Sequence, residues 1–599
     1  MAADLTRGFT RFAAARLGDT VKPSGPRLPH LPRLDRHQAL QIIAVVTALV
    51  VLLPLVWLVL RATGAGAEGL AWALRPRTLT ILSNSIVLTV TVMAGALAIG
   101  LPFAWLTARC QLPWRRFWLI AGLLTMVVPS YLGAVTLLAA FGPRGLLYDL
   151  LATVLPLERL PDIRGWFGAW LSITLITWPF IALPARAVLL GSDPALEEAA
   201  RSLGHGRWQV FRRVTLPLLR PALTGGSLLV ALYTLSDFGA VAVMRYNAFT
   251  RAIYLQYTSS FDRERAAILA LMLILLTLLL LLLERRLGQS RNGARLGAGA
   301  PRRLAPLPIG RWRWPALLFF VMIVGLGVAL PVAVLGSWLT RRALFNVTPP
   351  DMGMLTATTA TVSALAALAA GALALPLALL LRRRHSRLSH WLVALTSSGN
   401  VLPGIVVALA LVFFAARYLP AWYQTVPLLL LGYVTRFLPL AISASRSALE
   451  QISPRLEEAA RGLGQRPWQV VLRIYVPLAR ASILAGIALV FLSVMKELPT
   501  TLVLSPIGTR TFATHIWSAY SEALLSLIGG PGLLLLGVSA LGLIAILLRE
   551  RQPGAAPGTG VALLRELPRR ARHRVGHPCA FALISHDHRP GLPAARQAL

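Results

Sequence analysis

The sequence predicts an all-α membrane protein with about twelve transmembrane helices, arranged as two parallel repeats of six. Three observations support this fold class. The chain is 56% hydrophobic and only 14% charged, its mean hydropathy is +0.67, and one long segment occurs twice. A soluble chain carries nearer a quarter charged residues. The composition therefore favours a protein that crosses the membrane many times.

Apolar stretches long enough to cross a bilayer occur twelve times. A helical span takes about 20 mostly apolar residues, because backbone polar groups in lipid must be satisfied inside the helix. The first stretch is too long, and begins too late, for a signal-peptide core, so we expect an uncleaved anchor. The predicted spans are 39–60, 80–106, 117–141, 166–190, 222–244, 265–283, 315–339, 355–381, 391–415, 424–445, 481–504 and 523–548.

Basic residues gather between these spans. The net charge of +36 would suggest a nucleic-acid partner in a soluble chain, but here the clusters lie in 1–38, between Arg285 and Arg313, and from Arg382 to Arg387. With twelve spans, all three clusters fall on one side of the membrane. The positive-inside rule then predicts a multi-pass membrane protein with both termini cytoplasmic, and no nucleic-acid partner.

A duplicated segment divides the chain into two halves. LEEAARSLGHGRWQVFRRVTLP at 196–217 recurs as LEEAARGLGQRPWQVVLRIYVP at 456–477, an offset of 260 residues. Because six spans return the chain to its starting side, the halves are parallel repeats, and a pathway between them is the natural place for a substrate. The predicted parts are a cytoplasmic basic segment 1–38, a first repeat 39–283, an Arg-rich cytoplasmic linker 284–314, a second repeat 315–550 and a disordered basic tail 551–599.

The duplicated segment is polar and favours helix, which is unusual for a loop between spans. Pro194 and Pro454 suit a first helical turn, where the following glutamates are favoured by the helix dipole. Gly204 and Gly464 are placed to end that helix with a left-handed residue. A second short helix is expected to end near Pro217 or Pro477, where the next span begins. We therefore expect a helix–turn–helix on the cytoplasmic surface.

This segment resembles the signature loop of the permeases of binding-protein-dependent ABC importers. The matching residues are Glu198, Ala199, Ala200, Gly204, Val214, Leu216 and Pro217, and again Glu458, Ala459, Ala460, Gly464, Ile474, Val476 and Pro477. The resemblance implies the fold of type I ABC importer permeases, a place in the bacterial inner membrane and a first helix that docks in a groove of an ATPase subunit. The candidate docking residues are Glu197, Glu198, Ala199, Ala200, Gly204 and Pro217, with Glu457, Glu458, Ala459, Ala460, Gly464 and Pro477. An amphipathic helix lying on lipid is the alternative, but anionic lipid would repel the paired acids.

The chain is not expected to be an enzyme. A P-loop ends in Gly-Lys-Ser/Thr, whereas the two lysines, Lys22 and Lys496, follow valine and methionine. ATP hydrolysis would therefore belong to a separate subunit, present in two copies. We expect no catalytic residue and no cofactor. His573, His577 and Cys579 in the tail match no standard metal spacing, so no metal site is expected.

Charged residues in the fifth span of each half are candidates for the translocation pathway. Asp237 in the first half and Lys496 and Glu497 in the second occupy equivalent places. Charge inside a span usually has a partner or a function, so these residues either shape the pathway or cap broken helices and pair locally.

The phrases around these charges are similar to those of fused permeases of ferric-iron importers. They are Asp-Phe-Gly-Ala at 237–240, Lys-Glu-Leu-Pro-Thr-Thr at 496–501 and the segment 245–267. The resemblance implies a ferric ion delivered by a periplasmic binding protein. Importers of thiamine, polyamines or phosphonates share much of the pattern and stay open as alternatives. A proton-coupled secondary transporter, or a membrane scaffold, is the alternative from another class.

Overall fold

The computed structural model describes residues 36–549, apart from 65, 157, 261, 289–306, 345–347, 384–390, 393–394, 397–398 and 400–401. The chain divides into two units, Met1–Gly542 and Leu543–Leu599. The described part of the second unit is the end of the last helix, and the arrangement below concerns the first. The predicted disordered tail and most of the N-terminal segment and linker lie outside the described residues.

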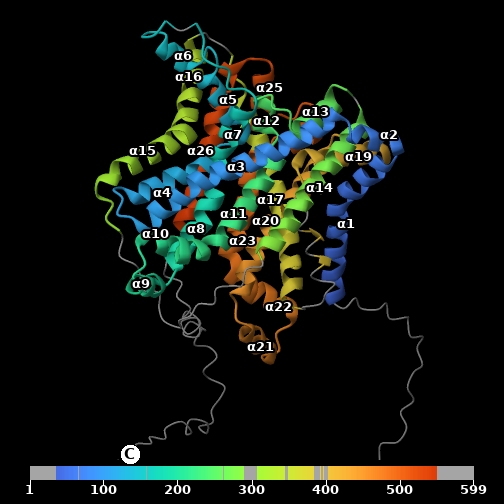
Figure 1. The fold of residues 1–599 in the computed structure, drawn as a ribbon. Helices are drawn as coiled ribbons and strands as arrows, with labels where there is room; N and C mark the ends of the chain where they lie inside the picture. The colour runs from blue at the N-terminus through green and yellow to red at the C-terminus, as the bar shows by residue number, and fades with distance from the viewer. Residues whose placement is uncertain are drawn as a thin grey trace, which may run out of the picture. The chain divides into compact units, whose positions relative to one another are not determined.

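The described chain is helical (Figure 1). The helices of the first half are α1 (Arg36–Thr63), α2 (Gly66–Ala73), α3 (Pro76–Arg109), α4 (Arg115–Leu123), η1 (Leu124–Val127), α5 (Ser130–Phe141), α6 (Leu146–Leu151), α7 (Trp166–Thr177), α8 (Pro179–Gly191), α9 (Pro194–Ser202), α10 (Arg207–Val210), η2 (Phe211–Thr215), α11 (Leu216–Ser236), α12 (Gly239–Val243), α13 (Phe249–Thr258) and α14 (Arg263–Gly288).

The second half repeats this order. Its helices are η3 (Gly310–Trp312), α15 (Arg313–Val324), η4 (Gly325–Ala329), α16 (Leu330–Leu344), α17 (Met352–Arg383), α19 (Gly404–Tyr418), η6 (Pro420–Trp422), α20 (Val426–Glu450), α21 (Pro454–Gly462), α22 (Pro467–Val470), η7 (Val471–Tyr475), α23 (Val476–Met495), α24 (Pro499–Leu504), α25 (Phe512–Ser521), η8 (Leu525–Leu527) and α26 (Gly529–Arg549).

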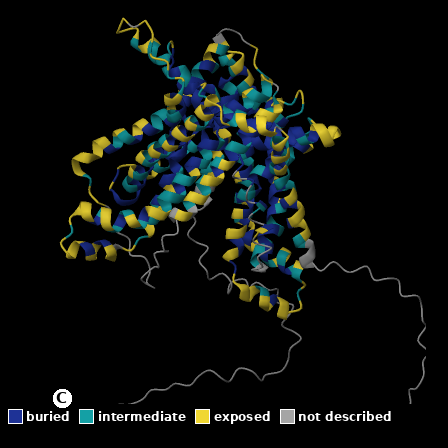
Figure 2. Cartoon of the chain, turned by 45° about the vertical axis from the view of Figure 1, so that its right-hand side comes forward, coloured by how far each residue is buried: buried dark blue, intermediate teal, exposed yellow. Residues whose placement is uncertain are grey.

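Within the described residues, 11 helices are long and apolar enough to cross a membrane, and Gly404–Tyr418 is a shorter apolar helix in the place of the ninth predicted span. Figure 2 shows exposed residues along the outward faces of the helices and buried residues between them. The exposed faces are apolar: on α1, Val46 is 54% and Leu49 62% exposed. Such faces suit contact with lipid. The predicted fold class, two repeats of about six membrane helices, is confirmed.

Three of the predicted spans are broken rather than continuous. The span expected at 117–141 consists of α4, η1 and α5, which meet at Val128 and Pro129. The fifth span of each half ends earlier than 244 or 504, because α11 stops at Ser236 and α23 at Met495. In both halves a short helix follows, so the charged residues lie at a break in the helix.

The second short helix of each loop does not end at its proline. Instead, α10 continues through η2 into α11, and α22 through η7 into α23. Pro217 cannot donate a backbone hydrogen bond, and the N–H of Leu216 reaches back five residues to the carbonyl of Phe211. This turn of π-helix lets the chain pass the proline without stopping. The expected end at Pro217 and Pro477 is therefore wrong.

The first span of each half packs against the other half. Helix α1 contacts α17 and α19, while α15, η4 and α16 contact α4, η1, α7 and α5. Gly327 in η4 allows the close approach, because a Cβ there would lie 2.5 Å from the side chain of Thr125. The two halves are thus held together by exchanged helices.

Candidate functional site

Two places carry the candidate residues: the loops at α9 and α21, and the breaks after α11 and α23. Figure 1 shows α9 and α21 at the same end of the molecule, with α13 and α25 at the other end. The two loops have matching geometry. Asp193 and Ser453 accept hydrogen bonds from the backbone N–H of Ala195 and Arg455, which caps the start of each helix.

A glycine ends each of these helices as the sequence predicts. Gly204 has φ +84° and Gly464 has φ +77°, in the left-handed region that favours glycine. The N–H of Gly204 donates to the carbonyl of Arg201 at 2.9 Å, and that of Gly464 donates to Arg461 at the same distance. Each short helix is thus fixed at both ends.

The first glutamate of each pair points into the protein. Glu197 is 8% exposed, and Arg109, at the end of α3, donates to its carboxylate at 2.8 Å. Arg201 and Thr215 contact the same carboxylate at 3.2 Å and 3.4 Å. This network ties α9 to α3, the second span of its half, and to η2 at the start of the fifth.

The second half has the same arrangement with different residues. Glu457 accepts hydrogen bonds from Arg461 and from the hydroxyl of Tyr475, which stands where the first half has Thr215. Arg382, near the end of α17, donates to the carbonyl of Ile452 at 2.7 Å, and its guanidinium lies 4.8 Å from the ring centre of Tyr475. Helix α21 is therefore tied to the second and fifth spans of its own half.

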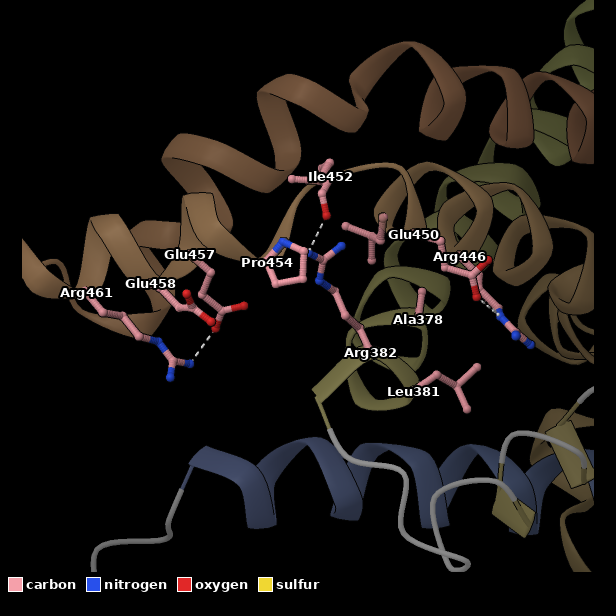
Figure 3. A pocket seen from close by; sticks show the side chains of 11 residues that line it. Ala378, Leu381, Arg382, Arg446, Glu450, Ile452, Pro454, Glu457, Glu458 and Arg461 are labelled. Carbon is pink, nitrogen blue, oxygen red and sulfur yellow. Dashed lines mark hydrogen bonds and ion pairs between the residues drawn. The ribbon is translucent and has the colours of Figure 1, made fainter. Parts of the chain in front are cut away.

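A cavity of about 500 Å³ lies beside α21, and Figure 3 shows the side chains that line it. Glu457 and Arg461 lie together at one side of it, Arg382 lies between Pro454 and Ile452, and the pair Arg446–Glu450 closes the other side. Its lining residues are Ala378, Leu381, Arg382, Arg446, Leu449, Glu450, Ile452, Pro454, Glu457, Glu458 and Arg461.

The second glutamate of each pair faces outward. Glu198 and Glu458 are exposed, together with Ala199 and Ala459, while Ala200 and Ala460 are buried. Large apolar side chains are exposed beside them in matching positions. These are Leu196 (41%), Leu203 (78%) and Trp208 (70%) in the first half and Leu456 (46%), Leu463 (84%) and Trp468 (46%) in the second. Each loop thus exposes large apolar side chains and the second glutamate of its pair, and we call these exposed residues the docking face, after the role that the sequence predicts.

At the break after α11, Asp237 caps the following helix. Its carboxylate accepts from the backbone N–H of Ala240 at 2.9 Å and from the hydroxyl of Ser130. Its backbone carbonyl accepts from Thr250 at 2.7 Å. Asp237 is 7% exposed, so the side chain is buried and its hydrogen bonds are satisfied.

Glu497 caps the equivalent helix and also pairs with an arginine. It accepts from the N–H and hydroxyl of Thr500 at 3.3 Å and 2.8 Å, and it forms an ion pair with Arg436 of α20. Gly404 leaves the space for this arginine, since a Cβ there would collide with the guanidinium. Ser130 occupies the position of Gly404 in the first half. There its hydroxyl donates to Asp237, whereas Glu497 pairs with an arginine, so the two breaks differ in charge.

Lys496 joins the two halves. Its ammonium donates to the carbonyl of Met126 at 3.0 Å. Met126 lies in η1, at the broken third span of the first half. The break of one half is therefore bonded to the break of the other, which brings Asp237, Lys496 and Glu497 into one region.

Several residues of these sites were not identified from the sequence. Arg109, Arg382, Arg436 and Thr215 lie 18 to 88 residues from their partners. Local spacing carries no signal of such contacts. A weak signal exists for Arg109, since it ends the second span just as Arg382 and Arg383 do in the repeat.

The chain matches known transport proteins along most of its length. The family model described as "Binding-protein-dependent transport system inner membrane component" matches residues 39–292 and again 370–551. The chain is 30% identical over 473 residues to "Fe(3+)-transport system permease protein FbpB 2" of Haemophilus influenzae, which covers 78% of this chain and 90% of that protein.

Other relatives match one or both halves. The chain is 25% identical over 464 residues to "Probable ABC transporter permease protein y4fN" of Sinorhizobium fredii, covering 72% of this chain and 80% of that one. It is 34% identical over 167 residues to "Molybdenum transport system permease protein ModB" of Escherichia coli, covering 26% of this chain and 69% of that one.

Proposed function

Since the chain belongs to the family of binding-protein-dependent transport system inner membrane components, we propose that two separate ATPase subunits drive it and that its substrate is ferric iron. The chain is the permease of an ABC importer and crosses the membrane many times. A periplasmic binding protein delivers the substrate, and the two halves enclose the translocation pathway. Both docking faces and both termini are cytoplasmic.

The paired docking faces carry this proposal. Isolated exposed leucines are ordinary on a protein surface, but the same two leucines, tryptophan and glutamate recur in both halves. Large apolar groups around one charge suit burial against a partner. One ATPase subunit docks on each face, where Glu198 or Glu458 meets a basic group of that subunit.

The inward glutamates have a different role in the same step. Glu197 holds α9 to the second and fifth spans of the first half, and Glu457 holds α21 to the start of the fifth span of the second half. When ATP draws the two ATPase subunits together, the loops move with them, and these contacts pass the motion to the spans. The halves then rock and open the pathway outward, and hydrolysis resets it.

Asp237, Lys496 and Glu497 lie at the midpoint of this motion. Lys496 bonds to Met126 at the broken third span of the first half. Ser130, at the same broken span, donates to Asp237. Because the bond of Lys496 to Met126 joins two places where helices are already interrupted, the halves can move apart here without disrupting a continuous helix. We therefore assign these residues to the translocation pathway.

Ferric iron is favoured by the extent of one similarity. The similarity to the ferric-iron permease of Haemophilus influenzae covers 78% of this chain, both halves included, whereas the similarity to the molybdenum permease covers 26% of this chain. Thiamine, polyamine and phosphonate importers remain the alternatives for the substrate. Uptake of radiolabelled ferric iron into proteoliposomes with ATP and a candidate binding protein tests this choice.

Charge reversal tests the docking faces. In the double variant E198K/E458K we expect the ATPase subunit to dissociate during co-purification, while the chain still inserts in the membrane. The matched control is D149K, because Asp149 is exposed on α6 at the other end of the molecule. Undiminished ATPase association in the double variant would disprove the docking role. ATP-independent uptake driven by a proton gradient would favour a secondary transporter.

A further inference from the structure

Residues of α5, α13 and α25 line a second cavity, and these helices lie at the end of the molecule opposite α9 and α21 (Figure 1). Its volume is about 580 Å³, which is within the usual range for small-molecule sites. Both halves contribute. Its lining residues are Val135, Leu138, Ala139, Arg164, Ala242, Arg245, Arg251, Tyr254 and Leu255 from the first half and Trp517, Tyr520, Ser521, Ala523 and Leu525 from the second.

The cavity is strongly cationic. Arg164, Arg245 and Arg251 line it, and none of its lining residues is acidic. Burial, and after it the charge of Arg245, lower the pKa of Arg251. None of the three arginines forms an ion pair with another residue of the described chain. Like charges held together without a counter-charge favour an anionic ligand.

Two acidic residues are close in sequence to lining residues, but neither lines the cavity. Asp162 accepts a hydrogen bond from the backbone N–H of Arg164, and Glu522 follows the lining residue Ser521. Two lining residues also have left-handed backbones without being glycine: Arg245 with φ +53° and Ala523 with φ +60°. Such strained positions gather at binding sites.

An aromatic floor separates this cavity from the helix breaks. Trp517 of the second half packs on Phe238 and Tyr254 of the first, with ring centres 5.2 Å and 6.4 Å apart. The hydroxyl of Tyr520 donates across the same seam to the carbonyl of Val243 at 3.2 Å. Phe238 follows Asp237 directly, so the cavity lies one aromatic layer above the proposed pathway.

We propose that this cavity receives the substrate as an anionic, oxygen-rich species, such as ferric iron complexed by carboxylates, before the aromatic floor opens. This inference rests on the proposed import function and refines the chemical form of the cargo. Three guanidinium groups repel a bare trivalent cation, whereas each can form two parallel hydrogen bonds with a carboxylate or phosphate. The aromatic floor opens as the halves rock apart.

Equilibrium binding to the full chain in nanodiscs tests the proposal. The probes are radiolabelled ferric citrate, citrate alone and orthophosphate, each measured at low and high salt. In the variant R164Q/R245Q/R251Q we expect binding of ferric citrate to weaken about tenfold or more, with a smaller salt dependence. The control is R144Q, since Arg144 is exposed on the same outer side without lining the cavity.

The outcomes separate the possibilities. Tight binding of ferric citrate alone assigns the site to the metal complex, and equal binding of citrate or phosphate assigns it to the free anion; both support an anionic ligand. Unchanged binding of ferric citrate in the triple variant overturns the proposal. The proposal is also overturned if the triple variant still binds ferric citrate but no longer associates with a binding protein, because the arginines would then contact that protein and not the cargo. This assay needs no ATPase, so failure of the import function shows separately, as absent uptake in proteoliposomes by the unmodified complex.

Discussion

Glu197 and Glu198 are neighbours in the sequence, yet their carboxylates meet opposite surroundings. Successive residues of an α-helix point about 100° apart, so only one of the pair can turn inward. The resemblance to importer loops placed both in the docking site. The structure divides them: Glu197 is held by Arg109, and Glu198 is exposed. The sequence could not show this, because the partner that fixes the inward direction lies on another span.

At the residue scale, we expect R109M to destabilise the first loop. The side chains of Arg109 and Glu197 are 6% and 10% exposed, and removing one partner of a buried ion pair costs about 3 kcal/mol or more. Arg201 and Thr215 still contact the carboxylate, so the loss should lie near the lower end of that range. Thermal unfolding in detergent, with limited proteolysis of 190–217, measures it.

The matched control is R201M. Arg201 is 45% exposed and contacts the same carboxylate from the next helical turn, and such exposed pairs contribute only about 0.5 kcal/mol. An equal loss of stability in R109M and R201M would contradict the assigned role of Arg109.

For the pathway residues, we expect E497Q to impair transport more than D237N. Replacing Glu497 leaves the partly buried Arg436 without its counter-charge, so uptake should fall by about tenfold or more. In D237N the amide oxygen can still accept from Ala240, and the loss should be smaller. ATP-driven uptake in vesicles measures both variants. Normal uptake by both would remove the pathway role.

At the scale of single elements, the short helix of each loop depends on its terminal glycine. Gly464 has φ +77° with open space around it, so G464A introduces backbone strain without a collision. The strain costs about 1 kcal/mol, and we expect weaker ATPase association and faster proteolysis of 451–477. Gly462, two residues earlier, also has open space but an ordinary backbone.

G462A is therefore the control for G464A. Alanine favours helix more than glycine does, so this change should be neutral or stabilise by up to about 0.5 kcal/mol. Similar effects of both substitutions would show that the left-handed backbone is not what the loop requires.

Elements with local signals were predictable, and elements shaped by the fold were not. Proline and glycine spacing predicted α9 and α21 well, because caps and left-handed residues are local features. Hydropathy located the spans but not the breaks at Pro129 and Asp237, since a broken helix in a protein interior is as apolar as a continuous one. The continuous passage at Pro217 was missed because a π turn leaves no mark in composition.

At the scale of the whole molecule, the packing of α1 and α15 against the opposite half could not be predicted from the sequence. The duplication predicted two similar units, but not that the first span of each unit would pack against the other unit. Parallel repeats and a central seam were predictable, because six spans per unit fix the orientation. Contacts across the seam depend on side chains hundreds of residues apart, such as Lys496 and Met126.

We therefore expect residues 1–295 and 296–599 to assemble when expressed as separate chains. The exchanged helices bury apolar surface between the halves, so the peptide connection is not needed for association. Affinity purification of one fragment should recover the other, and uptake should be partly restored. The variant K496M, which removes the bond to Met126, should lower the recovery. If both fragments insert in the membrane but never co-purify, the exchanged helices do not hold the two halves together.

The three arginines of the outer cavity all come from the first half, while the second half supplies the tryptophan and one tyrosine. A permease made of two identical chains would repeat every charge across its two-fold axis, and a delivering protein could land on it in two equivalent poses. Fusion removes that equivalence. A delivering protein that recognises the three arginines of this cavity therefore has a single productive orientation on the permease.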